Sequence, residues 1–225
     1  MAPAYLPSML FSTLLALHIA GGALGLLAGT AVIARAKGDR VHRRIGRAFA
    51  AGMITAGLTS LVMAVLHPNV FLFIVGVFTL YLVGTGMRYN RLRGLGRGER
   101  PAAIDYGLTG AMAVFGVAFL AYGGYALARG GTMGTVLLVF GAIGLLSVRQ
   151  DVGNYRGRVK SPRYWLLAHV ARMMGAYIAA LTAFLVVNAE HLPSAVPGVV
   201  WWLLPTAVLV PFIVRWNRGI RLGRR

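Results

Sequence analysis

The chain has 225 residues, of which 58% are hydrophobic and only 12% charged, and its formal net charge is +18 at pH 7. With a mean hydropathy of +0.71, this composition excludes a water-soluble domain of this length, because a soluble fold needs more polar surface. The positive charge alone would suit a nucleic-acid binder. Such proteins, however, spread basic residues over a solvated face, and here the basic residues separate apolar runs of about 20 residues. Cysteine is absent, which excludes disulfides, thiolate metal sites and cysteine nucleophiles.

Seven apolar segments follow one another along the chain. They predict an all-α, polytopic transmembrane helical bundle that forms one domain over residues 1–225. At about 1.5 Å per residue, each segment is long enough to cross a hydrocarbon core roughly 30 Å thick. The segments are rich in glycine, which disfavours soluble helices but suits close packing of membrane helices. The predicted spans are residues 8–34, 46–67, 69–87, 102–128, 131–149, 164–188 and 197–214.

The basic residues predict the orientation of this bundle. All lysines and arginines except Arg129 and Arg172 lie in four clusters, which follow the first, third, fifth and seventh spans. Because loops rich in lysine and arginine stay on the cytoplasmic side, the N-terminus is predicted outside and the C-terminus in the cytoplasm. The clusters are Arg35–Arg47, Arg88–Arg100, Arg149–Arg163 and Arg215–Arg225.

The histidines of the first two spans are candidates for cofactor chemistry. His18 heads a stripe of Gly22, Gly25 and Gly29 on one helical face. One interpretation is a tight helix contact with a hydrogen-bonded histidine. The other is a heme or metal ligand, or a proton-exchanging group, since neutral imidazole coordinates metals and titrates near neutrality. His67, at the outer end of the second span, shares a site with His18 only if the two helices pack side by side and His67 points inward.

Arg172 is the only basic residue well inside a predicted span, and His169 precedes it by three positions on the same helical face. An unpaired charge at that depth is costly, so Arg172 needs a partner. Asp105, one turn into the fourth span, is the only acidic residue near a matching depth in another span, which predicts a buried Asp105–Arg172 pair. The alternative is an Arg172 side chain that snorkels to the cytoplasmic headgroups.

The segment from Val41 to Arg47 enters the second span and is strongly basic. Clustered arginines beside a span attract anionic lipid headgroups, so Arg43, Arg44 and Arg47 are interpreted as lipid-facing. The expected partners are therefore the lipid bilayer and anionic phospholipid headgroups on the cytoplasmic side, with a homo-oligomer left open and no nucleic acid. The alternative for this side is a polar pocket, whose candidate residues are His42, Asp105, Asp151, His169 and Arg172.

Three stretches of the sequence carry a family resemblance. They are His18-Ile19-Ala20-Gly21-Gly22, Lys37-Gly38 with His42-Arg43-Arg44-Ile45-Gly46-Arg47, and His169-Val170-Ala171-Arg172-Met173 with Gly175-Ala176-Tyr177. They resemble an uncharacterised family of prokaryotic multi-pass membrane proteins that is known only as a domain of unknown function. The resemblance implies a bacterial inner-membrane protein and supplies no activity. It is strongest at His18, His42, His169 and Arg172.

Three functions are compatible with these patterns. The favoured one is a non-enzymatic transporter, sensor or accessory protein that binds a small solute or a proton in the polar pocket around His169 and Arg172. The second is a b-type heme redox protein, similar in outline to ferric reductase membrane domains, with His18, His67 and His169 as candidate ligands. The third is a metal-dependent membrane hydrolase that resembles zinc ceramidase-type enzymes, with His42, His169 and Asp105 as ligands and a bound water as nucleophile. The chain lacks the H-x-x-x-H pair of those enzymes.

Overall fold

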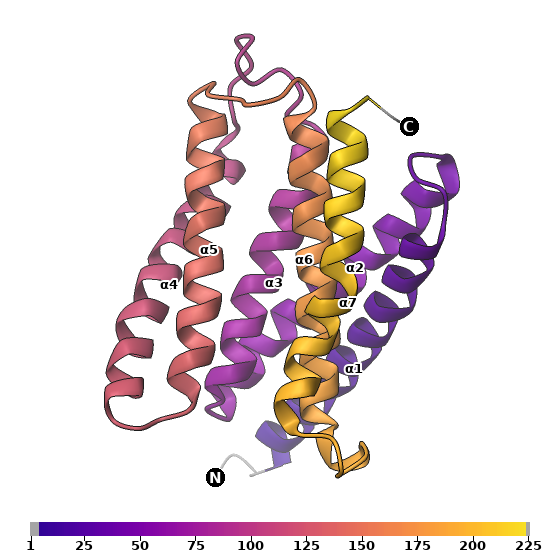
Figure 1. The fold of residues 1–225 in the computed structure, drawn as a ribbon. Helices are drawn as coiled ribbons and strands as arrows, with labels where there is room; N and C mark the ends of the chain where they lie inside the picture. The colour runs from indigo at the N-terminus through magenta and orange to yellow at the C-terminus, as the bar shows by residue number, and fades with distance from the viewer. Residues whose placement is uncertain (1–4, 224–225) are drawn as a thin grey trace. The chain divides into compact units, whose positions relative to one another are not determined.

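The computed structural model describes residues 5–223, which form seven α-helices, one short 3-10 helix and no strand within that range (Figure 1). All seven α-helices are long and apolar enough to cross a membrane. This confirms the predicted all-α fold with seven spans. The helices are α1 (Tyr5–Ala34), α2 (Arg40–Leu66), α3 (Val70–Tyr89), α4 (Ala103–Ala128), α5 (Met133–Tyr155), α6 (Tyr164–Val187) and α7 (Gly198–Arg221), and the 3-10 helix η1 is Ala189–His191.

Three helices extend by six residues or more beyond their predicted apolar runs. α2 begins at Arg40, six residues before the predicted start at residue 46. α5 continues to Tyr155 and α7 to Arg221, past the predicted ends at residues 149 and 214. Hydropathy finds only the apolar part of a helix, whereas backbone hydrogen bonding continues through polar residues. As a result, Asp151 and Asn154 lie on α5 and not in a loop.

The early start of α2 follows from a cap. The Asp39 side chain accepts a hydrogen bond from the backbone N–H of His42 at 2.6 Å, which satisfies one of the free donors at the helix start. Arg35 lies 2.9 Å from the same carboxylate. The His42 N–H bond and then Arg35 lower the pKa of the Asp39 carboxyl below its ordinary value of 3.8.

The chain divides into two compact units, which are described separately. Unit 1 comprises Met1–Val83 with Gly175–Leu209, and unit 2 comprises Gly84–Met174 with Val210–Arg225. The boundaries between the units fall inside α3, α6 and α7.

Unit 1 is built on close packing of α1 against α2. A Cβ atom added at Gly52 would lie 2.6 Å from the Gly21 carbonyl oxygen, and one added at Gly25 would lie 2.5 Å from the Met53 sulfur. Only glycine allows the backbones to approach this closely. The contact face therefore contains Gly21 and Gly25, and the predicted place of Gly22 in it is wrong, because a Cβ there would meet open space.

Unit 2 contains the antiparallel hairpin of α4 and α5, which lie side by side in Figure 1. A Cβ at Gly134 would lie 2.7 Å from the Gly123 carbonyl oxygen, and one at Gly141 would lie 3.0 Å from that of Gly116. The two helices thus touch through small residues along much of their length.

Many large apolar side chains on these helices remain exposed. Leu27 is 73% exposed, Val65 72%, and Val114 and Val187 69% each. Because they lie on helices long and apolar enough to span a membrane, these side chains contact lipid.

Candidate functional site

A buried ion pair of unit 2 joins Arg172 on α6 to Asp151 on α5. Arg172 is 3% exposed and Asp151 is fully buried. Arg172 Nη2 donates to Asp151 Oδ1 at 2.7 Å and to the backbone oxygen of Ser147, one turn earlier on α5, at 2.9 Å. The Arg172 head group is therefore held inside unit 2, against the snorkelling alternative.

The predicted Asp105–Arg172 ion pair is wrong. Asp105 is fully buried, but it accepts hydrogen bonds from Nε and Nη2 of Arg88, each at 2.7 Å. This bidentate geometry is the strong form of an arginine–carboxylate contact. Hydropathy ends the fifth span at residue 149 and so leaves Asp151 outside it. The continuation of α5 to Tyr155 is what brings Asp151 to Arg172.

Asp151 collects hydrogen bonds from three other helices of unit 2. In addition to Arg172 of α6, the Tyr89 hydroxyl of α3 donates to Oδ1 at 2.7 Å, and the Thr109 hydroxyl of α4 donates to Oδ2 at 3.4 Å. Asn154, which follows Asp151 by about one turn of α5, donates to the Tyr89 hydroxyl at 3.0 Å. One buried carboxylate thus joins α3, α4, α5 and α6. A buried charge is tolerated only when a counter-charge and hydrogen-bond donors compensate for the loss of water.

His169 lies beside this network on α6 but binds other groups. Its Nδ1 lies 2.7 Å from the Gly86 carbonyl oxygen and 3.0 Å from Asn90 Nδ2. Because a carbonyl oxygen can only accept, the shorter contact favours a proton on Nδ1 that is donated to Gly86. His169 and Arg172, which are neighbours on one helical face, therefore serve different contacts in unit 2.

The histidines of unit 1 do not fit a shared heme. His18 Nδ1 lies 3.0 Å from the Ala56 carbonyl oxygen and 3.3 Å from Thr59 Oγ1, which matches the interpretation as a hydrogen-bonded histidine in a tight helix contact. His67 packs edge-on against Phe11, with ring centroids 4.3 Å apart. It follows Ala56 by 11 residues, which is about 16 Å at roughly 1.5 Å per residue. A heme with two axial histidines needs both at one level, so this pair cannot hold it.

The ligand set of the hydrolase alternative is not assembled either. Among residues 5–223, no group of three or more His, Cys, Asp or Glu side chains could hold a metal ion. Both carboxylate oxygens of Asp105 accept bonds from Arg88. The Nδ1 of His169 is engaged by the Gly86 carbonyl oxygen. The residues present therefore do not fit a zinc centre of this composition.

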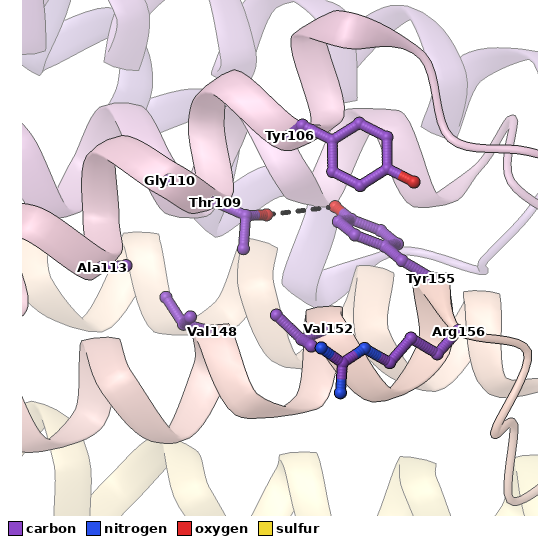
Figure 2. Close-up of a pocket in the computed structure, with 8 residues that line it drawn as sticks. All are labelled: Tyr106, Thr109, Gly110, Ala113, Val148, Val152, Tyr155 and Arg156. Atoms are coloured by element: carbon purple, nitrogen blue, oxygen red, sulfur yellow. Dashed lines mark hydrogen bonds between the residues drawn. The ribbon is translucent and has the colours of Figure 1, made fainter.

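A groove of about 390 Å³ runs between α4 and α5 in unit 2. Figure 2 shows that its polar end is formed by Thr109 and Tyr155, whose hydroxyls lie 3.2 Å apart. The Tyr106 ring packs edge-on against the Tyr155 ring, with ring centroids 5.6 Å apart. The rest of the lining is apolar apart from one guanidinium and comprises Gly110, Ala113, Val148, Val152 and Arg156.

The groove is connected to the buried ion pair through one hydroxyl. Thr109 Oγ1 lies within hydrogen-bond distance of both Tyr155 Oη and Asp151 Oδ2. Since a hydroxyl has a single proton and Asp151 can only accept, Thr109 donates to Asp151 and accepts from Tyr155. Tyr155, Thr109 and Asp151 therefore form a directed chain from the groove to the Arg172–Asp151 pair.

Sequence reasoning missed the groove. Neither His169 nor Arg172 lines it, while Tyr106, Tyr155 and Arg156 do. The available signal was the spacing of Asp151 and Tyr155, which are one helical turn apart once α5 is extended past its apolar run. In unit 1, Arg43, Arg44 and Arg47 are exposed at the start of α2, and their contact with lipid headgroups stays a prediction.

In comparisons with protein-family models, with curated proteins and with solved structures, nothing matches this chain. The family resemblance of its three short stretches stays a prediction.

Proposed function

We propose that this chain is a non-enzymatic transporter, sensor or accessory protein of the bacterial inner membrane, and that its ligand site is the groove between α4 and α5. The observation that carries the proposal is the hydroxyl chain from Tyr155 through Thr109 to Asp151, which links an open groove to a buried ion pair. This site replaces the pocket around His169 and Arg172 as the place of binding. Arg172 keeps a role behind the groove, as the partner of Asp151.

The lining of the groove favours an amphipathic ligand. Ala113, Val148 and Val152 offer apolar surface to a hydrocarbon chain, while Tyr155 and Arg156 offer hydrogen bonds and a positive charge at one end. Lipid chains compete for the apolar part, so the polar end must provide the selectivity. A ligand with an acyl chain and a hydrogen-bonding or anionic head satisfies both parts.

Binding can be coupled to the ion pair because the connecting bonds are long. The Thr109 bonds to Tyr155 and Asp151 measure 3.2 and 3.4 Å, compared with 2.7 Å for Arg172 to Asp151. Long bonds are weak, so a ligand that engages the Tyr155 hydroxyl redirects them at small cost. A ligand that prefers one arrangement of these bonds shifts the population of helix arrangements around Asp151.

The orientation is part of the proposal. The connections around Arg97 and Lys160 and the C-terminus lie on the cytoplasmic side, and the N-terminus lies outside. Arg43, Arg44 and Arg47, which are exposed at the start of α2, contact anionic phospholipid headgroups on the same side.

A labelled single-cysteine protein tests the groove. Because the chain contains no cysteine, Ala113→Cys can be labelled with bimane without background and the protein placed in phosphatidylcholine nanodiscs. The matched control is Val114→Cys, one residue along α4 and 69% exposed. Titration with oleate should saturate and shift the bimane emission at position 113 while leaving position 114 unchanged.

A second variant separates the groove from its hydroxyl chain. Tyr155→Phe removes the hydroxyl but keeps the ring that packs on Tyr106, so the fold should be preserved. We expect it to weaken the oleate response at position 113 by roughly tenfold, the effect of one lost hydrogen bond to a charged group. Equal responses at positions 113 and 114, or a Tyr155→Phe protein that responds like its parent, would show bulk partitioning and refute the proposal.

A further inference from the structure

A second cavity of unit 2, which the proposed function does not use, is lined by basic side chains. It measures about 380 Å³ and is formed by the α3–α4 and α5–α6 connections. Three of its lining side chains are cationic and none is acidic. The polar groups at its wall come from Arg93, Arg97, Lys160, Ser161 and Tyr164.

The two connections that form the cavity are tied to each other. The Tyr164 hydroxyl donates to the Leu92 carbonyl oxygen at 2.5 Å and accepts from the Leu95 N–H at 2.9 Å. Gly96, at φ +84°, approaches Gly157 so closely that a Cβ there would lie 3.1 Å from the Gly157 carbonyl oxygen. Both features hold the cavity wall in place before any ligand binds, which lowers the entropy cost of binding.

The arginine stems are also positioned. The Arg93 guanidinium lies 4.2 Å from the centroid of the Trp165 ring, and its Nε donates to the Asn90 carbonyl oxygen at 2.9 Å. Arg97 Nη2 donates to the Arg93 carbonyl oxygen at 3.1 Å. These contacts use only some of the five N–H donors that each guanidinium carries. The others remain for a ligand.

The positive charge of the cavity exceeds the negative charge near it, because its three cations lie close to a single carboxylate, that of Glu99. Asp105 pairs with Arg88 and Asp151 with Arg172, so both buried carboxylates of unit 2 are committed elsewhere. Glu99 accepts from the Gly94 backbone N–H and does not line the cavity. Within residues 5–223, the Lys160 ammonium makes no hydrogen bond or ion pair. An anion is the ligand that this arrangement of charge favours.

We propose that this cavity binds a phosphate-class anion, which is either the phosphodiester of an anionic phospholipid or a phosphate group of a soluble ligand. Arg93 and Arg97 donate through their guanidinium groups, and Lys160 adds a mobile ammonium. Ser161 Oγ accepts the Arg163 N–H at 3.2 Å, so its own proton is left for a phosphate oxygen. The site is independent of the groove between α4 and α5.

The test measures anion binding by the full-length protein. In neutral detergent, inorganic phosphate and glycerol 3-phosphate are titrated calorimetrically at low salt. In nanodiscs, the melting temperature of the protein in phosphatidylglycerol is compared with that in phosphatidylcholine. The variants are Lys160→Gln and Arg97→Gln, and the matched control is Arg158→Gln, which removes an exposed charge from the same connection but lies outside the cavity lining.

The results distinguish a specific anion site in the cavity from general attraction of anions to the basic surface. We expect either cavity variant to weaken the binding of a soluble phosphate by roughly tenfold in affinity, the effect of one lost charge-assisted hydrogen bond. If the ligand is a lipid, either variant should reduce the rise in melting temperature that phosphatidylglycerol gives. Arg158→Gln should change the affinity by less than about twofold. Binding of both soluble phosphates identifies a free phosphate ligand, whereas an effect confined to phosphatidylglycerol nanodiscs identifies a lipid. Equal losses in all three variants, or no binding of any of these anions, would overturn the proposal.

Discussion

Replacing Arg172 with leucine removes the cation from the buried ion pair of unit 2 and leaves the Asp151 carboxylate with hydroxyl donors from Tyr89 and Thr109. Leucine fills most of the volume of the arginine stem, so the main change is electrostatic. The variant therefore isolates the contribution of the charge. Its effect can be worked out from the bonds that Arg172 makes.

Arg172 donates hydrogen bonds to Asp151 and to the Ser147 carbonyl oxygen. A hydrogen bond that involves a charged group contributes about 1.5–3 kcal/mol, which gives roughly 3–6 kcal/mol for two. Breaking a buried ion pair by removing one partner typically costs about 3–5 kcal/mol. We expect Arg172→Leu to lower the free energy of unfolding by about 3–5 kcal/mol.

Removing both charges should be far less damaging. In Arg172→Leu/Asp151→Leu no buried charge is left without its counterion, and the remaining loss is the acceptor of the Tyr89 and Thr109 hydroxyls, about 1 kcal/mol each. The double variant should therefore be more stable than Arg172→Leu alone. The coupling energy of the two sites should be about 2–3 kcal/mol, as expected for residues in direct contact.

Equilibrium unfolding in mixed micelles, with the fraction of sodium dodecyl sulfate as the denaturing variable, measures these free energies. The comparison pair is Arg172→Leu with Asp105→Leu, because Asp105 is bound by Arg88. The coupling energy between positions 172 and 105 should be well below that between positions 172 and 151. A larger coupling of Arg172 to Asp105 than to Asp151, or a loss below about 1 kcal/mol for Arg172→Leu, would refute the reasoning.

Three further predictions concern topology, helix packing and pH. An impermeant maleimide should label Ser161→Cys only after the cytoplasmic side is opened, and Thr132→Cys in intact cells, since positive connections stay inside. Gly52→Val should destabilise unit 1 by about 1–3 kcal/mol, because its Cβ would lie 2.6 Å from a carbonyl oxygen of α1, whereas Gly22→Ala, facing open space, should change stability by less than about 1 kcal/mol. The pKa of Asp39 is lowered in the folded chain, so its cap contributes fully above the unfolded pKa, and the contribution is lost as the pH falls through 3.8 to the lower folded pKa. Melting curves of the parent and of Asp39→Asn should therefore converge with acidification.

Opposite results would count against each of these predictions. Labelling of both cysteines from the same side would contradict the alternation of sides. A valine at position 52 that is tolerated as well as an alanine at position 22 would contradict the close approach of α1 and α2. A stability difference between parent and Asp39→Asn that grows as the pH falls would contradict the sign of the pKa shift.

Some residues of the candidate site can be predicted from the sequence, whereas their partners cannot. The sequence identifies Arg172 as a buried cation that needs a carboxylate, because its position inside an apolar run is legible without coordinates. It selects the wrong carboxylate, since the polar last turns of α5 carry no hydropathy signal, and these turns contain Asp151. Likewise, His18 is recognisable as a residue of a tight helix contact. Which glycines complete that contact depends on the rotation of α1 about its axis, and this brings Gly21, not Gly22, to α2.

The sequence by itself determined the all-α class and the seven spans, because length and hydropathy are properties of single segments, and its basic clusters predict the side of each connection. Only the tertiary structure decided that Arg88 binds Asp105, that Asp151 joins four helices, and that Tyr155 and Thr109 open this network to a groove. Which polar side chains bind one another depends on the rotation of each helix about its axis and on where polar turns continue a helix. Both are set by contacts between segments, such as the glycine approaches of α4 and α5, and no single segment encodes them.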